Sequence, residues 1–336
     1  MADPVLSEAE ADRRLAQNPR DIEALVAKAE ARTGERDDRT AAAFYRAALS
    51  AASAAGPLPE RFRPVIARAQ AGLARAESYF ESYLDEALSR SGFPAGTRPR
   101  RFQAGLDMLF GRRPFDLQLQ APTAFYLPGL PQKRYYERRE FGWAPALEAK
   151  APAMRAELQA FLETAGDCFS PYITSDPSKP RSDVHGLLDN PAWSTLYLHE
   201  QGAPVAGVAE HFPTTMSTVE ELDLPRIGVH APSILFSRLK AGARIPPHHG
   251  VINARLICHL PLVVPPGCGF RVGGETRRWS EGELLVFDDS IEHEAWNTGG
   301  RDRIILIFDI WRPEVTADER RALVAMFDAI NAYARV

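Results

Sequence analysis

The chain has 336 residues, of which 45% are hydrophobic, 25% charged and 9% aromatic, so it can bury an ordinary globular core. Its 40 Lys and Arg against 44 Asp and Glu give a formal charge of -4, which argues against a nucleic-acid-binding protein with a broad basic face. Cys168, Cys258 and Cys268 form no C-x-x-C pair, so neither a disulfide framework nor a Cys-ligated zinc site is expected. The sequence holds neither an apolar signal region at its start nor a membrane-length apolar run, which predicts a cytoplasmic protein without membrane insertion.

Residues 1–90 are rich in Ala, Arg and Glu and poor in β-branched residues, which predicts a helical region. Ser7 and Glu10 are spaced as a capping box at the start of the first helix. Turn and charge signals then separate four expected helices, at about 8–17, 22–34, 40–55 and 61–90. The Pro-led turn and the small residues of the two middle helices are typical of a tetratricopeptide-like repeat, but an ordinary helical hairpin has the same pattern.

Residues 91–120 are predicted to form a linker. Its five arginines are compatible with a phosphate-binding patch, although a solvated connector is the favoured interpretation: Arg98, Arg100, Arg101, Arg112 and Arg113. From residue 121 onward the chain changes to short apolar runs broken by Gly and Pro, with one expected helix near 144–165.

The strand signals become clear from about residue 193. They are short β-branched or aromatic runs joined by Gly- and Pro-rich turns: WSTLYLHE, SILFSRLK, NARLICHLPLVV, FRV, RRW, ELLVF and RIILIFDIW. Many short strands without interleaved helices favour an antiparallel jelly roll. We therefore expect an α+β protein with a double-stranded β-helix (jelly roll or cupin class) over 121–315. A helix over 316–336, started by a capping box of Thr316 and Glu319, ends the chain.

Four of the chain's eight histidines occupy informative places in the predicted barrel: His248, His249, His259 and His293. Two of them, His248 and His293, lie 45 residues apart in the sequence. A jelly roll can fold both imidazoles to one mouth of the barrel, because one precedes a strand and the other follows one. Two neutral imidazoles suit Fe(II), and in non-haem oxygenases a carboxylate completes a facial triad. The usual H-x-D/E slot is here His248-His249-Gly250, so the acid is absent. Taken alone, such a pair is more often two ordinary polar residues than a metal site.

A polar strand face is predicted in the same region. Alternation along NARLICHLPLVV places Arg255, Ile257 and His259 on one face and apolar side chains on the other. Arg303 opens the strand RIILIFDIW, and a guanidinium inside a barrel needs an anion, which its planar fork binds in bidentate fashion. The alternatives are a surface ion pair for Arg303 and a satisfied core histidine for His259.

The run from Ser233 to Thr316 resembles the catalytic domain of the aspartyl/asparaginyl β-hydroxylase family. Three motifs carry the resemblance: P-H-x-G-x-x-N-x-R-L from Pro247, F-D-D-S-x-E-H-E-x-W-N from Phe287 and D-I-W-x-P from Asp309. It extends upstream to about residue 120. The resemblance implies an Fe(II)- and 2-oxoglutarate-dependent dioxygenase that hydroxylates an Asp or Asn residue, or a related substrate, of a peptide, protein or small molecule. The family also often carries tetratricopeptide-like helices before the barrel.

The resemblance assigns metal-site roles to individual residues. His248 and His293 match the two iron ligands, whereas His249 matches none. Gly250 matches the glycine that replaces the triad carboxylate, so water would fill that coordination position. Asp289 matches an aspartate that holds this water.

The resemblance also implies a co-substrate pocket. Its 2-oxoglutarate contacts match Trp193, Ser237, His259 and Arg303, with Arg303 pairing the distal carboxylate. Arg255 matches a basic residue placed near the substrate.

Two features depart from the family pattern. Position 257 is Ile where a second pocket arginine is expected, and no cysteine pair lies between residues 194 and 237. Both argue against epidermal-growth-factor-like domains as the substrate. Three alternatives stay open: hydroxylation of a lipid acyl chain, a halogenase with chloride in the empty acid slot, and a non-catalytic cupin-like binding protein.

Overall fold

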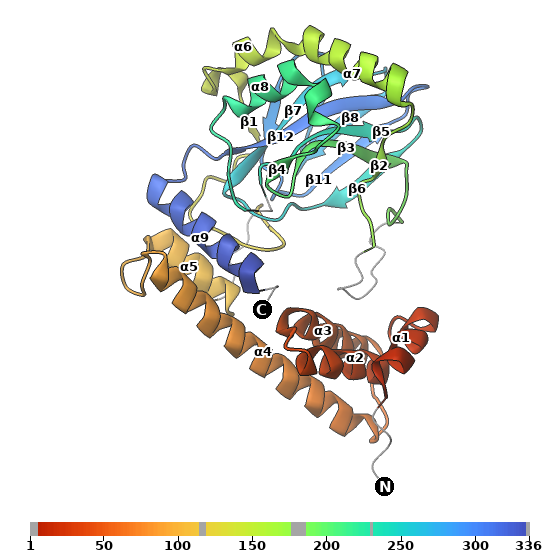
Figure 1. Cartoon of the computed structure of the whole chain (residues 1–336), viewed down its shortest axis with the longest axis vertical. Coiled ribbons are helices and arrows are strands. Elements are labelled where there is room, and N and C mark those ends of the chain that lie inside the picture. The colour runs from red at the N-terminus through yellow and green to blue at the C-terminus, as the bar shows by residue number, and fades with distance from the viewer. Residues whose placement is uncertain (1–5, 114–118, 176–185, 229–230, 334–336) are drawn as a thin grey trace. The chain divides into compact units, whose positions relative to one another are not determined.

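A computed structural model describes residues 6–113, 119–175, 186–228 and 231–333 (Figure 1). These residues divide into two compact units. The first contains residues 6–96, 175 and 328–333, and the second contains residues 97–113, 119–174, 186–228 and 231–327. Within this described part of the chain, no helix is both long and apolar enough to cross a membrane.

The first unit is helical, as the sequence predicts. Its helices are α1 (Glu8–Gln17), α2 (Ile22–Gly34), α3 (Asp38–Ala54) and α4 (Phe62–Arg90). Asp21 and Asp37 cap α2 and α3, because their carboxylates accept hydrogen bonds from the otherwise unpaired amides of Ala24 and Thr40. A Cβ at position 72 of α4 would lie 2.3 Å from the Tyr45 ring, so a glycine there permits α3 and α4 to approach closely. The tetratricopeptide-like interpretation of these helices stays a prediction.

The second unit begins with a helix that the sequence analysis missed. Helix α5 (Arg100–Leu109) lies within the stretch 91–120 that was predicted to be a solvated linker, so that prediction is wrong here. Phe102 and Leu106 are one helical turn apart and fully buried, which gives α5 an apolar face. Arg101 binds Glu319 through Nε and Nη2, at 2.8 and 2.7 Å, so this arginine is paired with a carboxylate.

Two antiparallel sheets form the body of the second unit. The larger has the order β1-β10-β7-β12-β5-β3-β2, with β4 beside β3, and the smaller has the order β6-β11-β8-β9. The larger sheet consists of β1 (Tyr135–Tyr136), β2 (Ser170–Pro171), β3 (Trp193–Glu200), β4 (Ala203–Pro204), β5 (Ile234–Leu239), β7 (Arg255–Val263), β10 (Leu285–Phe287) and β12 (Arg303–Trp311). The smaller consists of β6 (Arg244–His248), β8 (Cys268–Val272), β9 (Glu275–Arg277) and β11 (His293–Asn297).

The larger sheet is covered on both faces. Helices α6 (Ala144–Glu148), α7 (Ala151–Ala165) and α8 (Pro213–Glu220) pack on its outer face (Figure 1), where Leu256, Cys258 and Leu260 join the apolar core. Its other face looks toward the smaller sheet across a second apolar core. This arrangement confirms the predicted α+β class and the double-stranded β-helix, and α6 and α7 confirm the helix expected near 144–165.

Helix α9 (Ala317–Tyr333) follows the last strand. Its predicted capping box is present, because Thr316 Oγ1 accepts from the Glu319 amide at 3.4 Å and Glu319 Oε2 accepts from the Thr316 amide at 2.9 Å. The three final residues of the predicted helix, 334–336, lie outside the described part of the chain.

Candidate active site

A cavity of about 370 Å³ opens between the two sheets of the second unit. The alternation of strand side chains explains its walls, since residues two apart share a face. On β7 the cavity is lined by Arg255, Ile257 and His259, as predicted, while the intervening side chains enter the core under the helices. Arg303 of β12 and His293 of β11 line it as well. The sheets therefore gather one polar set of side chains around a single hollow.

His248 and His293 face each other at this cavity. They are register partners on β6 and β11, and their ring centroids lie 4.1 Å apart. His248 Nδ1 contacts the carbonyl of Pro246 at 2.8 Å, and His293 Nδ1 contacts that of Ile291 at 3.0 Å. Because a carbonyl oxygen only accepts, each Nδ1 carries a proton, and in a neutral ring Nε2 is then the nitrogen with the lone pair. Burial and the neighbouring His248 lower the pKa of His293 to about 3, so this ring is neutral at ordinary pH.

Gly250 and Asp289 occupy the position next to this pair. A Cβ on Gly250 would lie 2.0 Å from Asp289 Oδ2, so the aspartate fills the space that a side chain at 250 would need. Asp289 is buried, and its Oδ1 has no hydrogen-bond partner in the structure. Burial is the main cause that raises the pKa of Asp289 to about 7, against the opposing effect of Arg255.

The donor set at this mouth suits one metal ion held by two imidazoles. The orientation of each ring, with Nδ1–H on a backbone carbonyl, is the one that histidine ligands of metals commonly adopt. Among the described residues, no three or more His, Cys, Asp and Glu side chains are grouped to hold a metal. Any metal here would thus keep positions open for water and small ligands.

The opposite end of the cavity is built around Arg303. Its side chain is 1% exposed, and it donates one hydrogen bond from Nη2 to Ser237 Oγ at 3.3 Å. Its Nε has no hydrogen-bond partner, and the guanidinium lies 5.0 Å from the ring centroid of Trp279. Burial lowers the pKa of Arg303 to about 10, and it has no carboxylate partner among the described residues. A buried guanidinium in this state is a binding site for an anion.

Hydrogen-bond donors surround the same end. Trp193 Nε1 donates to Ser237 Oγ at 3.2 Å, and Trp279 Nε1 donates to His259 Nδ1 at 3.3 Å. Burial, with Arg303 and His293 nearby, holds the pKa of His259 well below its usual value, so the ring is neutral. Since Nδ1 of His259 accepts, its Nε2 carries the proton and can donate to a ligand.

Arg255 is in a different state from Arg303. Its Nη1 binds Asp309 Oδ2 at 2.7 Å, and its Nη2 lies 3.5 Å from Asp289 Oδ2. Asp309 is 1% exposed and also accepts from the Ser233 amide at 3.0 Å. The two carboxyl groups therefore balance this guanidinium within the protein.

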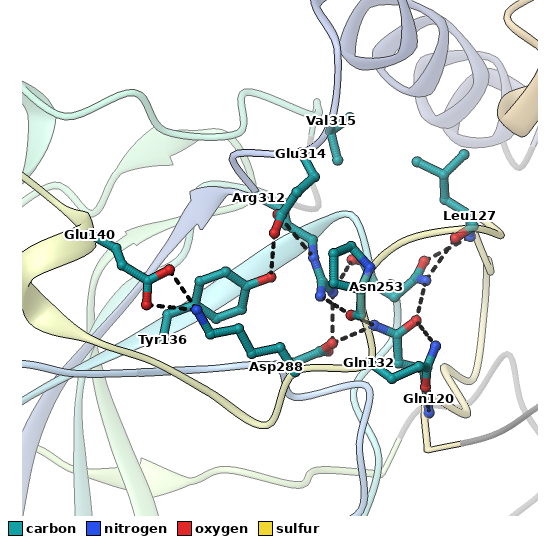
Figure 2. A network of polar contacts seen from close by, with 12 residues as sticks. Gln120, Leu127, Gln132, Tyr136, Glu140, Asn253, Asp288, Arg312, Glu314 and Val315 are labelled. Atoms are coloured by element: carbon teal, nitrogen blue, oxygen red, sulfur yellow. Dashed lines mark hydrogen bonds and ion pairs between the residues drawn. The ribbon is translucent and has the colours of Figure 1, made fainter.

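A buried polar network fixes the loop that carries Asp289 (Figure 2). Asp288 and Arg312 are both fully buried and pair at 2.7 Å. Gln120 donates to the same Asp288 oxygen at 2.6 Å, and Asn253 donates to Gln120 at 3.0 Å. The network joins the start of β7 to the loop between β10 and β11, so it holds the elements that present the polar cavity side chains.

The structure brings all the predicted site residues together at this cavity: Trp193, Ser237, His248, Arg255, His259, Asp289, His293 and Arg303. His249 and Ile257 also line it. Three further residues were missed by the sequence analysis. Trp279 was assigned to a strand, Asp309 was quoted only as part of a motif, and Tyr172, which stacks on Trp193 at 4.1 Å, carried no signal. Side-chain alternation along β12 would have predicted that Asp309 lies on the same strand face as Arg303.

A sequence profile described as Aspartyl/Asparaginyl beta-hydroxylase matches residues 148–313, which contain this cavity. This domain belongs to the aspartyl/asparaginyl β-hydroxylase family. The chain is 33% identical over 208 residues to the mouse aspartyl/asparaginyl beta-hydroxylase, covering 61% of this chain and 26% of that protein. It is 32% identical over 214 residues to Aspartate beta-hydroxylase domain-containing protein 2 of Xenopus tropicalis, covering 62% and 55%.

A third relative of the β-hydroxylase domain carries a different name. Ornithine lipid ester-linked acyl 2-hydroxylase of Rhizobium tropici is 30% identical over 181 residues, which cover 53% of this chain and 60% of that protein. The chain thus spans between about a quarter and three fifths of the length of these relatives. A cupin domain of a transcriptional regulator from Enterobacter cloacae aligns with a TM-score of 0.25 and 12% identity, over 36% of this chain and 98% of its own.

Proposed function

We propose that the chain is an Fe(II)- and 2-oxoglutarate-dependent hydroxylase acting on an Asp or Asn residue or a related substrate. The observation that carries the proposal is the pairing, in one cavity, of two facing imidazoles at the mouth with the uncompensated guanidinium of Arg303 at the far end. The first feature suits a divalent iron, and the second suits a carboxylate. Membership of the β-hydroxylase family supports the same chemistry.

In this proposal each residue has a defined task. His248 and His293 hold Fe(II) through Nε2, and Asp289 holds a water in the coordination position that Gly250 leaves open. Arg303 binds the distal carboxylate of 2-oxoglutarate, with Ser237 beside it. When bound, iron and 2-oxoglutarate supply the oxidising chemistry, in which O₂ gives one oxygen atom to succinate, released with CO₂, and one to a substrate C–H bond.

Further side chains position the co-substrate and keep water away from it. His259 offers Nε2–H as a donor, because Trp279 fixes its tautomer through Nδ1. Trp193 covers the cavity beside Ser237, and Tyr172 stacks on its outer face. Buried donors of this kind select a ligand carboxylate because they need no reorganisation when it arrives.

The halogenase alternative is less well supported. It places a chloride in the coordination position beside Gly250, where a water can donate a hydrogen bond to the neighbouring Asp289 carboxyl group and a halide cannot. A halide placed there would meet a carboxyl oxygen. The lipid acyl alternative keeps support from the named acyl 2-hydroxylase relative, and the cytoplasmic location remains a prediction.

Anaerobic titration of the metal-free chain tests the proposal. We expect one Fe(II) to bind, 2-oxoglutarate to bind in turn, and admission of O₂ to convert 2-oxoglutarate to succinate. The His249→Ala variant is a matched control, since it removes a neighbouring imidazole that has no assigned ligand role. Stoichiometric iron binding without any turnover of 2-oxoglutarate would favour the non-catalytic cupin-like protein instead.

A further inference from the structure

We propose that the group to be oxidised enters this cavity uncharged, as an amide or a hydrocarbon, and that a carboxylate is excluded. The inference rests on the proposed function, because it assumes that 2-oxoglutarate occupies Arg303. It goes further by choosing among the substrates that the family resemblance leaves open.

The charges on the cavity wall carry the argument. Five side chains with a carboxyl or guanidinium group line the cavity within the described part of the chain: Arg255, Asp289, Glu294, Arg303 and Asp309. Carboxyl groups thus outnumber guanidinium groups by three to two. Glu294 is bound by Arg244 and Arg271, which do not line the cavity, so it adds no attraction for an anion.

The two arginines of the wall are not equivalent. Arg303 has no carboxylate partner and can bind one anion. In the proposed function this anion is the distal carboxylate of 2-oxoglutarate. Arg255 is already bound by Asp309 and lies against Asp289. After the co-substrate has bound, no uncompensated cation of the described wall remains for a second carboxylate.

Most of the remaining wall is apolar, with histidine, serine and tyrosine side chains among the lining residues. Ile257 stands between Arg255 and His259 on β7, where a guanidinium would have added a positive charge. Toward solvent, the cavity is lined by Tyr172 and Val251, which are 41% and 46% exposed. These are two of the three exposed large hydrophobic side chains found among the described residues, so apolar surface is concentrated at this opening. Such an opening suits a substrate whose reacting part is uncharged.

A carboxylate in this position would lose water without gaining a counter-ion. Its desolvation in a partly open cavity predicts binding about 30- to 100-fold weaker than that of the matching amide.

Paired probes that differ only in charge test the inference without turnover. The chain is loaded with Zn(II) and 2-oxoglutarate in the absence of O₂, and binding is measured by ligand-observed NMR. One pair is a blocked Gly-Asn-Gly peptide and its Asp counterpart, and the other is octanamide and octanoate. We expect the uncharged member of at least one pair to bind and its anion to bind about 30- to 100-fold more weakly. Whichever pair binds shows whether the reacting group of the substrate is a peptide amide or an acyl chain.

The Ile257→Arg variant should largely remove the expected preference for the uncharged probes. It adds a cation to the wall and should recover most of the lost affinity for the anionic probes, whereas Ile257→Leu should retain the discrimination. If Ile257→Arg does not fold, Asp309→Asn gives the same test, because it releases Arg255 while its amide oxygen can still accept from the Ser233 amide.

Two outcomes overturn the inference. In one, the Asp peptide or octanoate binds wild-type protein as tightly as its amide. In the other, neither uncharged probe binds to protein that has taken up 2-oxoglutarate. Failure of 2-oxoglutarate itself to bind is a separate result that contradicts the proposed function.

Discussion

Replacing Arg303 by Met tests whether this arginine binds a ligand or stabilises the folded protein. In the ligand-free protein this guanidinium is buried with one long hydrogen bond and no carboxylate. Burial lowers its pKa from its usual value to about 10, so its charge costs the folded state roughly 3 kcal/mol at neutral pH, at about 1.36 kcal/mol for each pKa unit. The variant keeps most of the apolar stem, so we expect the ligand-free chain to lose no stability and to gain up to about 3 kcal/mol.

The same substitution should abolish co-substrate binding. A buried carboxylate that loses its guanidinium partner costs about 3 to 5 kcal/mol, which corresponds to more than about 100-fold in 2-oxoglutarate affinity. Calorimetry of 2-oxoglutarate binding to the Zn(II)-loaded protein measures this loss. Urea unfolding followed by tryptophan fluorescence measures the stability of the second unit, because all five tryptophans lie in it.

Arg301→Met is the matched control. It removes one positive charge two residues away, but the Arg301 side chain is exposed, so neither stability nor 2-oxoglutarate affinity should change appreciably. Destabilisation of Arg303→Met by more than about 2 kcal/mol together with an unchanged 2-oxoglutarate affinity would refute the reasoning. Arg303 would then be a structural residue that the protein itself satisfies.

Three further predictions concern the metal end of the cavity. His248→Ala and His293→Ala should each abolish Fe(II) binding in an anaerobic titration while His249→Ala retains it, and the reverse pattern for His248 and His249 would show the assignment to be wrong. Gly250→Ala should displace the Asp289 carboxyl group, since its Cβ would lie 2.0 Å from Oδ2, and should weaken Fe(II) binding by about 10- to 100-fold; wild-type affinity would contradict this role. Turnover should proceed in chloride-free buffer, because a water held by Asp289 takes the place of a halide in the proposed site, and strict dependence on chloride with a chlorinated product would favour the halogenase.

The four longest strands of the larger sheet, β3, β5, β7 and β12, could be predicted from the sequence because they are long and regular. WSTLYLHE corresponds to β3 residue for residue, and RIILIFDIW to β12. Alternation along β7 then placed Arg255 and His259 on the cavity face. Runs of eight or nine residues carry enough period-two signal for this, whereas β6 reads Arg-Ile-Pro-Pro-His and shows no such pattern.

The partners of the site residues could not be predicted in the same way. Asp309 pairs with Arg255 across neighbouring strands, and Trp279 reaches His259 and Arg303 from a segment that was assigned to a strand. These contacts depend on strand order and register, which a single sequence does not specify. The difference between a paired Arg255 and an uncompensated Arg303 is therefore visible only in three dimensions, and the proposed substrate charge depends on it.

A single measurement tests the central proposal most directly. The Fe(II)-loaded chain is given 2-oxoglutarate under isotopically labelled O₂, and the succinate is analysed by mass spectrometry. The account predicts succinate that carries one labelled oxygen atom, formed by wild-type protein and not by His293→Ala. Unconsumed 2-oxoglutarate, or succinate without the label, would contradict an Fe(II)- and 2-oxoglutarate-dependent oxygenase at this cavity.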